Sequence, residues 1–235
     1  MNAILLCAGI SKRLRPTSFN NPKCLIKFGR NNLLEFWLKK LNDIGIKKIL
    51  INTHYFDKKI KKFIYSNKIK DRVHITFEKQ LLGTAGTLMK NINFYDNQDG
   101  LLIHSDNFMT ENLKVFLQNH KRRPENCLMS MLTFSTNDPK SCGIIKSSKK
   151  NILEEFYEKP KKKVGNKANA AIYCLSKEMI KDLKLQNKSY IDFSTEIIPK
   201  YKRKIFCIHT NDFFIDIGNI KNLNLVKSRN RFHTN

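Results

Sequence analysis

The feature that most constrains the fold is a regular alternation of short apolar runs with amphipathic segments of helix length. Residues 2–7, N-A-I-L-L-C, form a continuous apolar run, which is typical of a strand buried on both faces. Residues 32–45 carry apolar side chains at three- and four-residue spacing and end at Gly45, which suits a helix C-terminus. The alternation then predicts strands at 46–53, 73–77 and 101–105 and helices at 57–66 and 84–92. Units of this length predict right-handed crossovers and an α/β fold, with a mostly parallel sheet and helices on both faces.

The pattern changes after residue 125. It predicts strands at 127–134, 152–158 and 168–175, helices near 177–185 and 192–200, a strand pair at 204–209 and 213–217, and a C-terminal helix. No internal repeat or low-complexity linker marks a boundary between domains. We therefore expect residues 1–235 to form a single domain.

The chain is strongly basic, with 44 Lys and Arg against 20 Asp and Glu and a formal net charge of +24. Such an excess suits an anionic partner, so a non-enzymatic nucleic-acid-binding protein is one interpretation. The lysines are dispersed, however, and the 16 phenylalanines lie mostly in apolar runs instead of between basic residues. A solvated basic surface is the better interpretation, and we expect no nucleic-acid partner.

The sequence also predicts where the protein resides. No apolar run approaches the roughly 20 residues that span a bilayer, and the N-terminus lacks the basic segment of a signal peptide. The six cysteines are scattered without a C-x-x-C pair, which excludes the common zinc spacings and gives no disulfide framework. These features predict a cytoplasmic protein with reduced thiols and no membrane partner.

The segment after the first strand is a candidate phosphate site, because ligands of such sheets bind beyond the carboxyl ends of the strands. It reads C-A-G-I-S-K-R-L-R-P, followed by Pro22-Lys23. Small residues let the backbone approach a phosphate, and Arg13, Arg15 and Lys23 can neutralise it. The segment matches neither G-x-G-x-x-G nor G-x-x-x-x-G-K-[ST], so by itself it is a weak signal.

Three further segments strengthen this interpretation. Residues 78–87, E-K-Q-L-L-G-T-A-G-T, lie at a predicted strand-to-helix junction, where small residues and free helix N–H groups admit a flat base. Asp106 follows the strand at 101–105, where a carboxylate can hold Mg²⁺ together with water and phosphates. Asp216 is a second carboxylate flanked by apolar residues. A single aspartate at a strand end is usually a cap or turn residue, but two in one chain favour a metal site.

The combined motifs resemble a known family. L-C-A-G-x-S-K-R-L-R-P, P-K, L-G-T-A-G, S-D, E-K-P, N-A-A-I-Y and D-I-G occur in this order over nearly the whole chain. They resemble the sugar nucleotidyltransferases, above all the mannose-1-phosphate guanylyltransferase-like enzymes. The resemblance implies a doubly wound, Rossmann-like fold that joins a nucleoside triphosphate to a sugar 1-phosphate and releases pyrophosphate. It also implies a nucleotide-binding half, about 1–125, and a sugar-phosphate-binding half, about 126–235.

The resemblance assigns roles on the nucleotide side. The nucleotide-binding residues that it implies are Leu6, Ala8, Gly9, Arg13, Lys23, Glu78, Gly83 and Thr84. Arg13 would hold the β- and γ-phosphates, and Lys23 would stabilise the charge that develops at the α-phosphate. Asp106 and Asp216 would share the catalytic Mg²⁺. Arg13, Lys23 and these two aspartates are therefore the expected catalytic residues.

On the acceptor side, the resemblance implies that Glu158 and Asn169 bind sugar hydroxyls, Lys159 meets the sugar phosphate and the Gly143 backbone lines the pocket. A sugar phosphate is already an anionic nucleophile, so no strong general base is required. In keeping with this, the histidines at positions 54, 104 and 120 have no spacing that suggests a metal site or a catalytic triad, and we interpret them as structural.

The chain departs from the family at three positions. Ser11 stands where a second glycine is usual, Lys12 where Thr or Ser is usual, and Leu81 where proline is common. A loop conformation that only glycine adopts freely would be strained at Ser11. Lys12 adds charge near the triphosphate and bears on nucleotide preference, whereas Leu81 should matter little.

Alternative functions on the same fold remain open. One is uridylyl or cytidylyl transfer to another sugar or to an alcohol phosphate. Another is a regulatory relative that binds a sugar nucleotide without turnover, although Lys23, Asp106 and Asp216 argue against it. The preferred interpretation is guanylyl transfer to mannose 1-phosphate or a related hexose or heptose 1-phosphate. The sequence leaves the base, the sugar and the oligomeric state undetermined.

Overall fold

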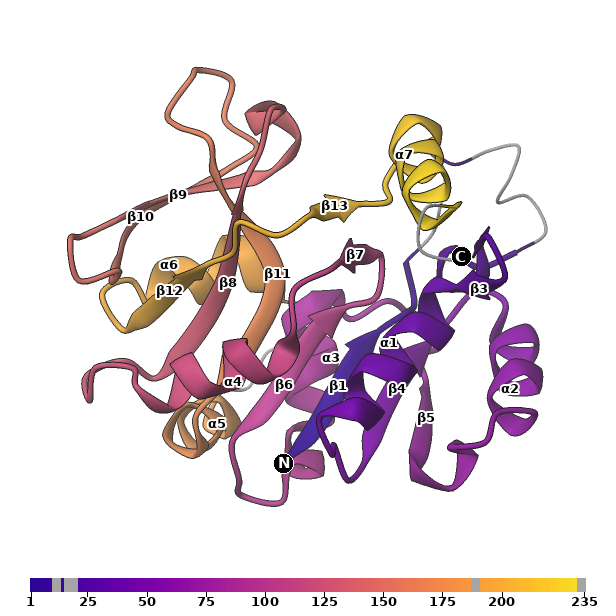
Figure 1. Cartoon of the computed structure of the whole chain (residues 1–235). Coiled ribbons are helices and arrows are strands. Elements are labelled where there is room, and N and C mark those ends of the chain that lie inside the picture. Colours follow the sequence, from indigo (N-terminus) through magenta and orange to yellow (C-terminus); the bar gives the residue numbers. More distant parts are fainter. Residues whose placement is uncertain (10–13, 15–20, 187–190, 232–235) are drawn as a thin grey trace.

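A computed structural model describes residues 1–9, 14, 21–186 and 191–231 (Figure 1). At its centre lies a nine-stranded sheet. Its strands are β1 (Asn2–Leu6), β4 (Ile49–Thr53), β5 (Val73–Phe77), β6 (Gly100–His104), β8 (Met129–Ser135), β9 (Gly143–Ser147), β10 (Leu153–Glu158), β11 (Lys167–Leu175) and β12 (Ile205–His209). The order β10-β9-β11-β6-β1-β4-β5 runs across it, and β8 pairs with β11 and β12.

The first half of the chain supplies a parallel core. β1 pairs in parallel with β4 and β6, and β4 pairs in parallel with β5. β11 runs antiparallel to β6 and β8 and joins the second half of the chain to this core. The α/β fold with a largely parallel central sheet is therefore confirmed, and the antiparallel pairs gather around β11 and β9.

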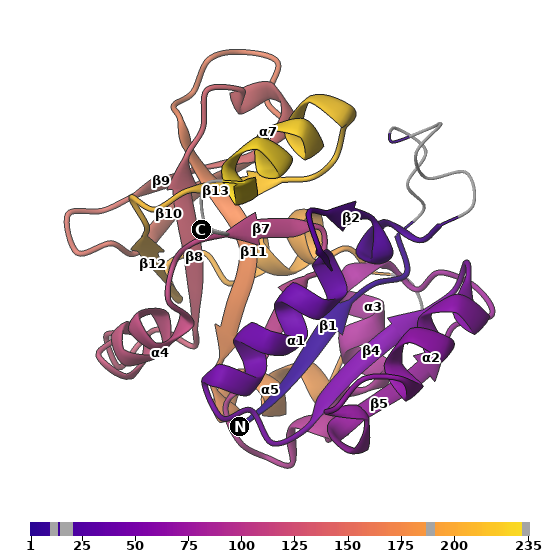
Figure 2. The same ribbon diagram turned by 45° about the vertical axis from the view of Figure 1, so that its right-hand side comes forward.

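Helices cover both faces of the sheet, as expected for a doubly wound fold (Figures 1 and 2). The helices α1 (Leu33–Asp43), α2 (Asp57–Tyr65) and α4 (Leu113–Lys121) pack on one face, and α3 (Gly83–Lys90), α5 (Lys177–Lys184) and α6 (Ile198–Lys200) pack on the other. Ala3 and Leu5 face the first set, whereas Ile4 faces the second. This alternation explains why the run at 2–7 has no polar face.

Helix α1 shows how local sequence sets the ends of an element. The Asn32 side chain accepts a hydrogen bond from the Glu35 N–H at 2.9 Å and so caps the N-terminus. At the other end Gly45 adopts a φ of +74°, which glycine reaches without steric cost. The predicted helix at 32–45 is confirmed.

A two-stranded antiparallel ribbon, β7 (Asn107–Met109) and β13 (Phe214–Asp216), stands apart from the main sheet. Helix α7 (Ile220–Arg231) and the small hairpin of β2 (Lys27–Phe28) and β3 (Asn31–Asn32) share a third apolar cluster with it. Figure 2 shows α7 beside this ribbon.

One prediction about the second half needs correction. The strands expected at 204–209 and 213–217 both form, but they do not pair with each other: β12 pairs with β8 in the main sheet, and β13 pairs with β7. The chain leaves the main sheet after Thr210, whose N–H still bonds the Thr133 carbonyl at 2.9 Å. Helix α4 and the strands β7 and β9 were not predicted, because each is short and carries few apolar residues in register.

Two global features were also expected. The six cysteines are all free thiols. Within the described part of the chain, no helix is both long enough and apolar enough to cross a bilayer.

A buried histidine links α4 to the sheet. His120 is 1% exposed, and its Nδ1 lies 2.8 Å from the Ser130 hydroxyl on β8. Its Nε2 lies 3.5 Å from the Asp99 carboxylate and 3.1 Å from the Arg123 guanidinium. Burial lowers the pKa of His120, partly countered by Asp99 and reinforced by Arg123, so the fold holds the neutral ring. This confirms the structural interpretation of His120.

We predict that His120 makes the fold sensitive to acid. An unfolded histidine titrates near pH ~6.5, so below that value the unfolded chain binds a proton that the folded ring resists, and the free energy of unfolding falls. His120→Asn should cost about 1–3 kcal/mol at pH 7.5, because buried partners lose hydrogen bonds, and should flatten the decline toward pH 5. Urea denaturation across this range measures both effects.

The matched control is His74→Asn, since His74 is exposed. It should leave both the stability and its pH dependence unchanged. The pKa values of His104 and His209 are also lowered, but both histidines are present in wild type and in both variants, so they affect all three proteins alike. An equal pH slope in wild type and His120→Asn would contradict the prediction.

Candidate active site

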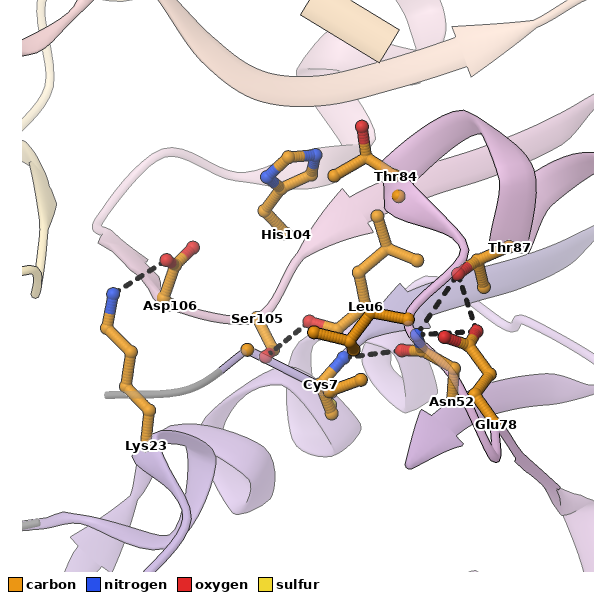
Figure 3. A pocket seen from close by; sticks show the side chains of 14 residues that line it. Leu6, Cys7, Lys23, Asn52, Glu78, Thr84, Thr87, His104, Ser105 and Asp106 are labelled. Carbon is orange, nitrogen blue, oxygen red and sulfur yellow. Dashed lines mark hydrogen bonds and ion pairs between the residues drawn. The ribbon is translucent and has the colours of Figure 1, made fainter. Parts of the chain in front are cut away.

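A pocket of about 300 Å³ opens at the carboxyl ends of the parallel strands (Figure 3). β1, β4, β5 and β6 run in the same direction, so the residues that follow them meet at one edge of the sheet. The lining residues are Leu6, Cys7, Ala8, Gly9, Lys23, Asn52, Glu78, Leu81, Gly83, Thr84, Thr87, His104, Ser105 and Asp106. Every described residue that the sequence assigned to nucleotide binding is among them.

One end of the pocket is built around a buried carboxylate. Glu78 is 1% exposed, and its Oε1 accepts hydrogen bonds from Asn52 Nδ2 at 3.0 Å and from the Thr87 hydroxyl at 2.5 Å. The Asn52 Oδ1 in turn accepts the Cys7 N–H at 2.8 Å. These bonds tie β1, β4, β5 and α3 together and fix the orientation of the Glu78 side chain, as Figure 3 shows.

At the other end, Lys23 and Asp106 line the pocket, and Lys23 also contacts Asp216, which lies outside the lining. Lys23 Nζ lies 2.6 Å from Asp106 Oδ2 and 3.2 Å from Asp216 Oδ1. The Lys23 side chain is only 13% exposed, and the two aspartates are 36% and 45% exposed. The three charged residues that the sequence placed at a common catalytic centre therefore lie in contact.

Each charge stabilises the other in its ionised form. Burial by itself would lower the pKa of Lys23, but Asp106 and Asp216 outweigh it and raise that pKa. Burial would likewise raise the pKa of Asp106, yet the Lys23 ammonium outweighs it and the pKa falls. The site therefore holds a lysine cation and an aspartate anion at neutral pH.

The β7–β13 ribbon brings Asp216 to this place. Asp216 pairs with Asn107 across the ribbon, and the Ile217 N–H bonds the Asp106 carbonyl at 2.9 Å. Asn107 is buried: its Nδ2 donates to the Ala170 carbonyl at 2.8 Å, and its own carbonyl accepts the Trp37 indole N–H at 2.9 Å. The backbone that carries both aspartates is thus anchored to β11 and α1.

The residues assigned to the sugar phosphate lie on β9 to β11. Gly143 pairs with Glu158 across β9 and β10, and a Cβ at Gly143 would lie 3.0 Å from Glu158 Oε2 and 2.6 Å from the Phe156 ring. Only glycine fits there without displacing these side chains. Lys159 Nζ lies 3.3 Å from Glu158 Oε1. Asn169 donates to the Tyr173 hydroxyl at 2.7 Å.

None of the four residues assigned to the sugar phosphate is part of the lining of the pocket. The Tyr173 ring lies edge-on to the His104 ring, with centroids 6.4 Å apart, and so connects Asn169 to the pocket wall. A bulge in β11 between Asn169 and Tyr173, with Ala171 at a φ of +51°, turns this stretch of strand.

Some of the predicted site lies outside the described residues, and some of the observed site was not predicted. Arg13, with Ser11 and Lys12, falls outside the described residues. Asn52 and Thr87 also line the pocket, but neither was assigned a role from the sequence. Asn52 lies near the end of the strand predicted at 46–53, and Thr87 ends the segment 78–87. A polar residue inside an otherwise apolar strand, such as Asn52, was the available signal.

Comparison with known proteins identifies the family, because the profile named "Nucleotidyl transferase" matches residues 2–230. The chain belongs to the nucleotidyl transferase family. It is 29% identical over 93% of its length to a D-glycero-α-D-manno-heptose 1-phosphate guanylyltransferase from Campylobacter jejuni, of which it covers 95%. It is 27% identical over 94% of its length to a mannose-1-phosphate guanyltransferase from Saccharomyces cerevisiae, of which it spans 62%.

Solved structures share this fold. HddC from Yersinia pseudotuberculosis, crystallised as a complex with GMP-PN, superposes with a TM-score of 0.80 at 19% identity, over 97% of this chain and 98% of that one. The family match and the shared fold confirm the doubly wound fold that the resemblance implied.

We predict that Asn52 supports the nucleotide end of the pocket. Asn52→Ala removes a donor from the buried Glu78 carboxylate and leaves the Cys7 N–H without its acceptor. The variant should lose about 1–3 kcal/mol of unfolding free energy, measured by urea denaturation. Asn119→Ala is the control and should change little, because the side chain of Asn119 is only partly buried and donates to the Val115 carbonyl of its own helix. Equal stabilities of the two variants would contradict the role given to Asn52.

Proposed function

We propose that this chain transfers a nucleotidyl group from a nucleoside triphosphate to a sugar 1-phosphate and releases pyrophosphate. The observation that carries the proposal is the convergence of Asp106 and Asp216 on the Lys23 ammonium, at 2.6 and 3.2 Å, beside a pocket at the carboxyl edge of the sheet. This arrangement suits a reaction between two anionic substrates, which requires charge neutralisation and alignment more than proton transfer.

The chemistry follows from these positions. A phosphate oxygen of the sugar 1-phosphate attacks the α-phosphorus, forming a new P–O bond as the bond to the pyrophosphate oxygen breaks. Lys23 lies where it can meet the α-phosphate, and its positive charge would stabilise the negative charge that develops there. Its flexible stem allows the ammonium to turn from the aspartates to the phosphate. The acceptor residues Glu158 and Asn169 would orient the sugar.

We also propose that Asp106 and Asp216 hold Mg²⁺. The proposal is supported by the Lys23 ammonium, a cation that contacts both carboxylates. Among the described residues, no group of three or more His, Cys, Asp or Glu side chains could hold a metal ion, so water and substrate phosphates would complete the coordination, as Mg²⁺ prefers. Bound there, Mg²⁺ would neutralise phosphate charge and hold the reacting oxygens in line.

GTP and mannose 1-phosphate, or a related hexose or heptose 1-phosphate, are the substrates that we propose. The names of the Campylobacter and yeast relatives and the ligand in the HddC crystal support guanine. The buried Glu78 carboxylate adds support, because a carboxylate accepts hydrogen bonds and guanine presents N–H donors. Uridylyl or cytidylyl transfer remains the alternative.

A substrate panel tests this function. The protein is incubated with each of GTP, ATP, UTP, CTP and dTTP and with mannose, heptose or glucose 1-phosphate or phosphocholine, and pyrophosphate release is measured. We expect release with a sugar 1-phosphate, and most with GTP. Release with phosphocholine alone would make this an alcohol-phosphate enzyme, and no release from any pair would overturn the proposed activity.

Replacing the carboxylates tests the catalytic centre. Asp106→Asn and Asp216→Asn should each lower kcat by roughly a hundredfold or more, because the metal loses a charged ligand. Asp212→Asn, at an exposed aspartate on the same segment as Asp216, should remain near wild type. Near-normal kcat in both test variants would remove the metal assignment.

A further inference from the structure

One polar atom in the pocket wall has no partner. Among the described residues, Nε2 of His104 is the buried side-chain nitrogen or oxygen that lacks a hydrogen bond. His104 ends β6, lines the pocket and lies two residues before Asp106. Burying a polar nitrogen without a partner is unfavourable, so this ring is in a position to gain from a ligand.

The polar side chains beside it are already paired within the protein. The Thr84 hydroxyl donates to Asp192 Oδ2 at 3.1 Å and accepts the Phe193 N–H at 2.7 Å. The Ser105 hydroxyl donates to the Leu6 carbonyl at 2.7 Å. Both hydroxyls therefore already donate within the protein, whereas Nε2 of His104 has no hydrogen-bond partner at all.

The position of His104 indicates which part of a ligand it would meet. Figure 3 shows its ring between Thr84, on the side of the Glu78 network, and Asp106, which contacts Lys23. A nucleotide has the base at one end, the phosphates at the other and the ribose between them. With the base near Glu78 and the phosphates near Lys23, the ribose lies against His104.

We propose that His104 hydrogen-bonds a ribose hydroxyl of the bound nucleotide and thereby makes the site selective for ribonucleotides. This inference rests on the proposed function. A hydroxyl both donates and accepts, so it suits either tautomer of a neutral imidazole. Nε2 is buried in the unliganded protein, His104 lines the pocket, and the Cβ–Cγ torsion of a histidine is broad, so the ring can rotate to present this nitrogen to a ligand.

The experiment compares nucleotides that differ only in the ribose. Binding of GTP, 2′-deoxy-GTP and 3′-deoxy-GTP is measured by titration calorimetry with Mg²⁺ and without sugar phosphate. Wild type should bind GTP roughly three- to tenfold tighter than the analogue that lacks the contacted hydroxyl. His104→Phe keeps the ring that packs on Tyr173 but removes the nitrogen. It should bind GTP and that analogue equally, with GTP weakened by the same factor.

Two further variants keep the test decisive. His104→Leu replaces the ring if the phenylalanine variant fails to fold, and the same loss of discrimination is expected. His74→Phe is the matched control, since His74 also packs edge-on against an aromatic ring, Phe94 at 5.4 Å, and does not line the pocket. It should discriminate as wild type does.

Two outcomes would overturn the proposal. One is undiminished discrimination in both His104 variants. The other is unchanged GTP binding with a raised KM for the sugar phosphate, which would assign His104 to an acceptor hydroxyl. If the substrate panel selects another base, the ribo and deoxy forms of that nucleotide are compared instead. Failure of wild type to bind any triphosphate would overturn the proposed function itself.

Discussion

The structure of the site depends on one electrostatic constraint: two carboxylates that lie far apart in the sequence, Asp106 and Asp216, both contact the Lys23 ammonium. Like charges repel, and the Lys23 ammonium offsets the repulsion by lying 2.6 Å from Asp106 and 3.2 Å from Asp216. The backbone is fixed independently by the β7–β13 ribbon and by the buried Asn107. The positions of the two aspartates therefore rest on the backbone as well as on the contact with Lys23.

The parallel core supplies the rest of the pocket by geometry alone. Its four strands end at one edge, so side chains that are far apart in the chain, such as Asn52, Glu78 and His104, face the same space. Their hydrogen bonds differ. Glu78 and Asn52 are joined in a closed network at one end of the pocket, whereas Nε2 of His104 has no hydrogen-bond partner.

Most of the basic residues that the structure describes lie away from the pocket. Among them, Lys23 lines it, and Lys159 lies beside Glu158. Others form exposed ion pairs, such as Lys39 with Asp43 and Lys146 with Glu155, which contribute little to stability. A net charge of +24 still produces a long-range field that attracts triphosphates and sugar phosphates, most strongly at low salt.

The sequence by itself determined the α/β class and most of the strands and helices, because apolar periodicity is a local signal. The motifs that carry the family resemblance also pointed to residues that line the pocket, among them Gly9, Lys23 and Glu78. Helix α1 and strand β1 formed where the pattern predicted them. Only the tertiary structure decided the partner of β13, the network of Asn52 with Glu78 and the unpaired nitrogen of His104. These depend on contacts between segments tens of residues apart, and periodicity within a segment carries no information about which distant strand it will meet.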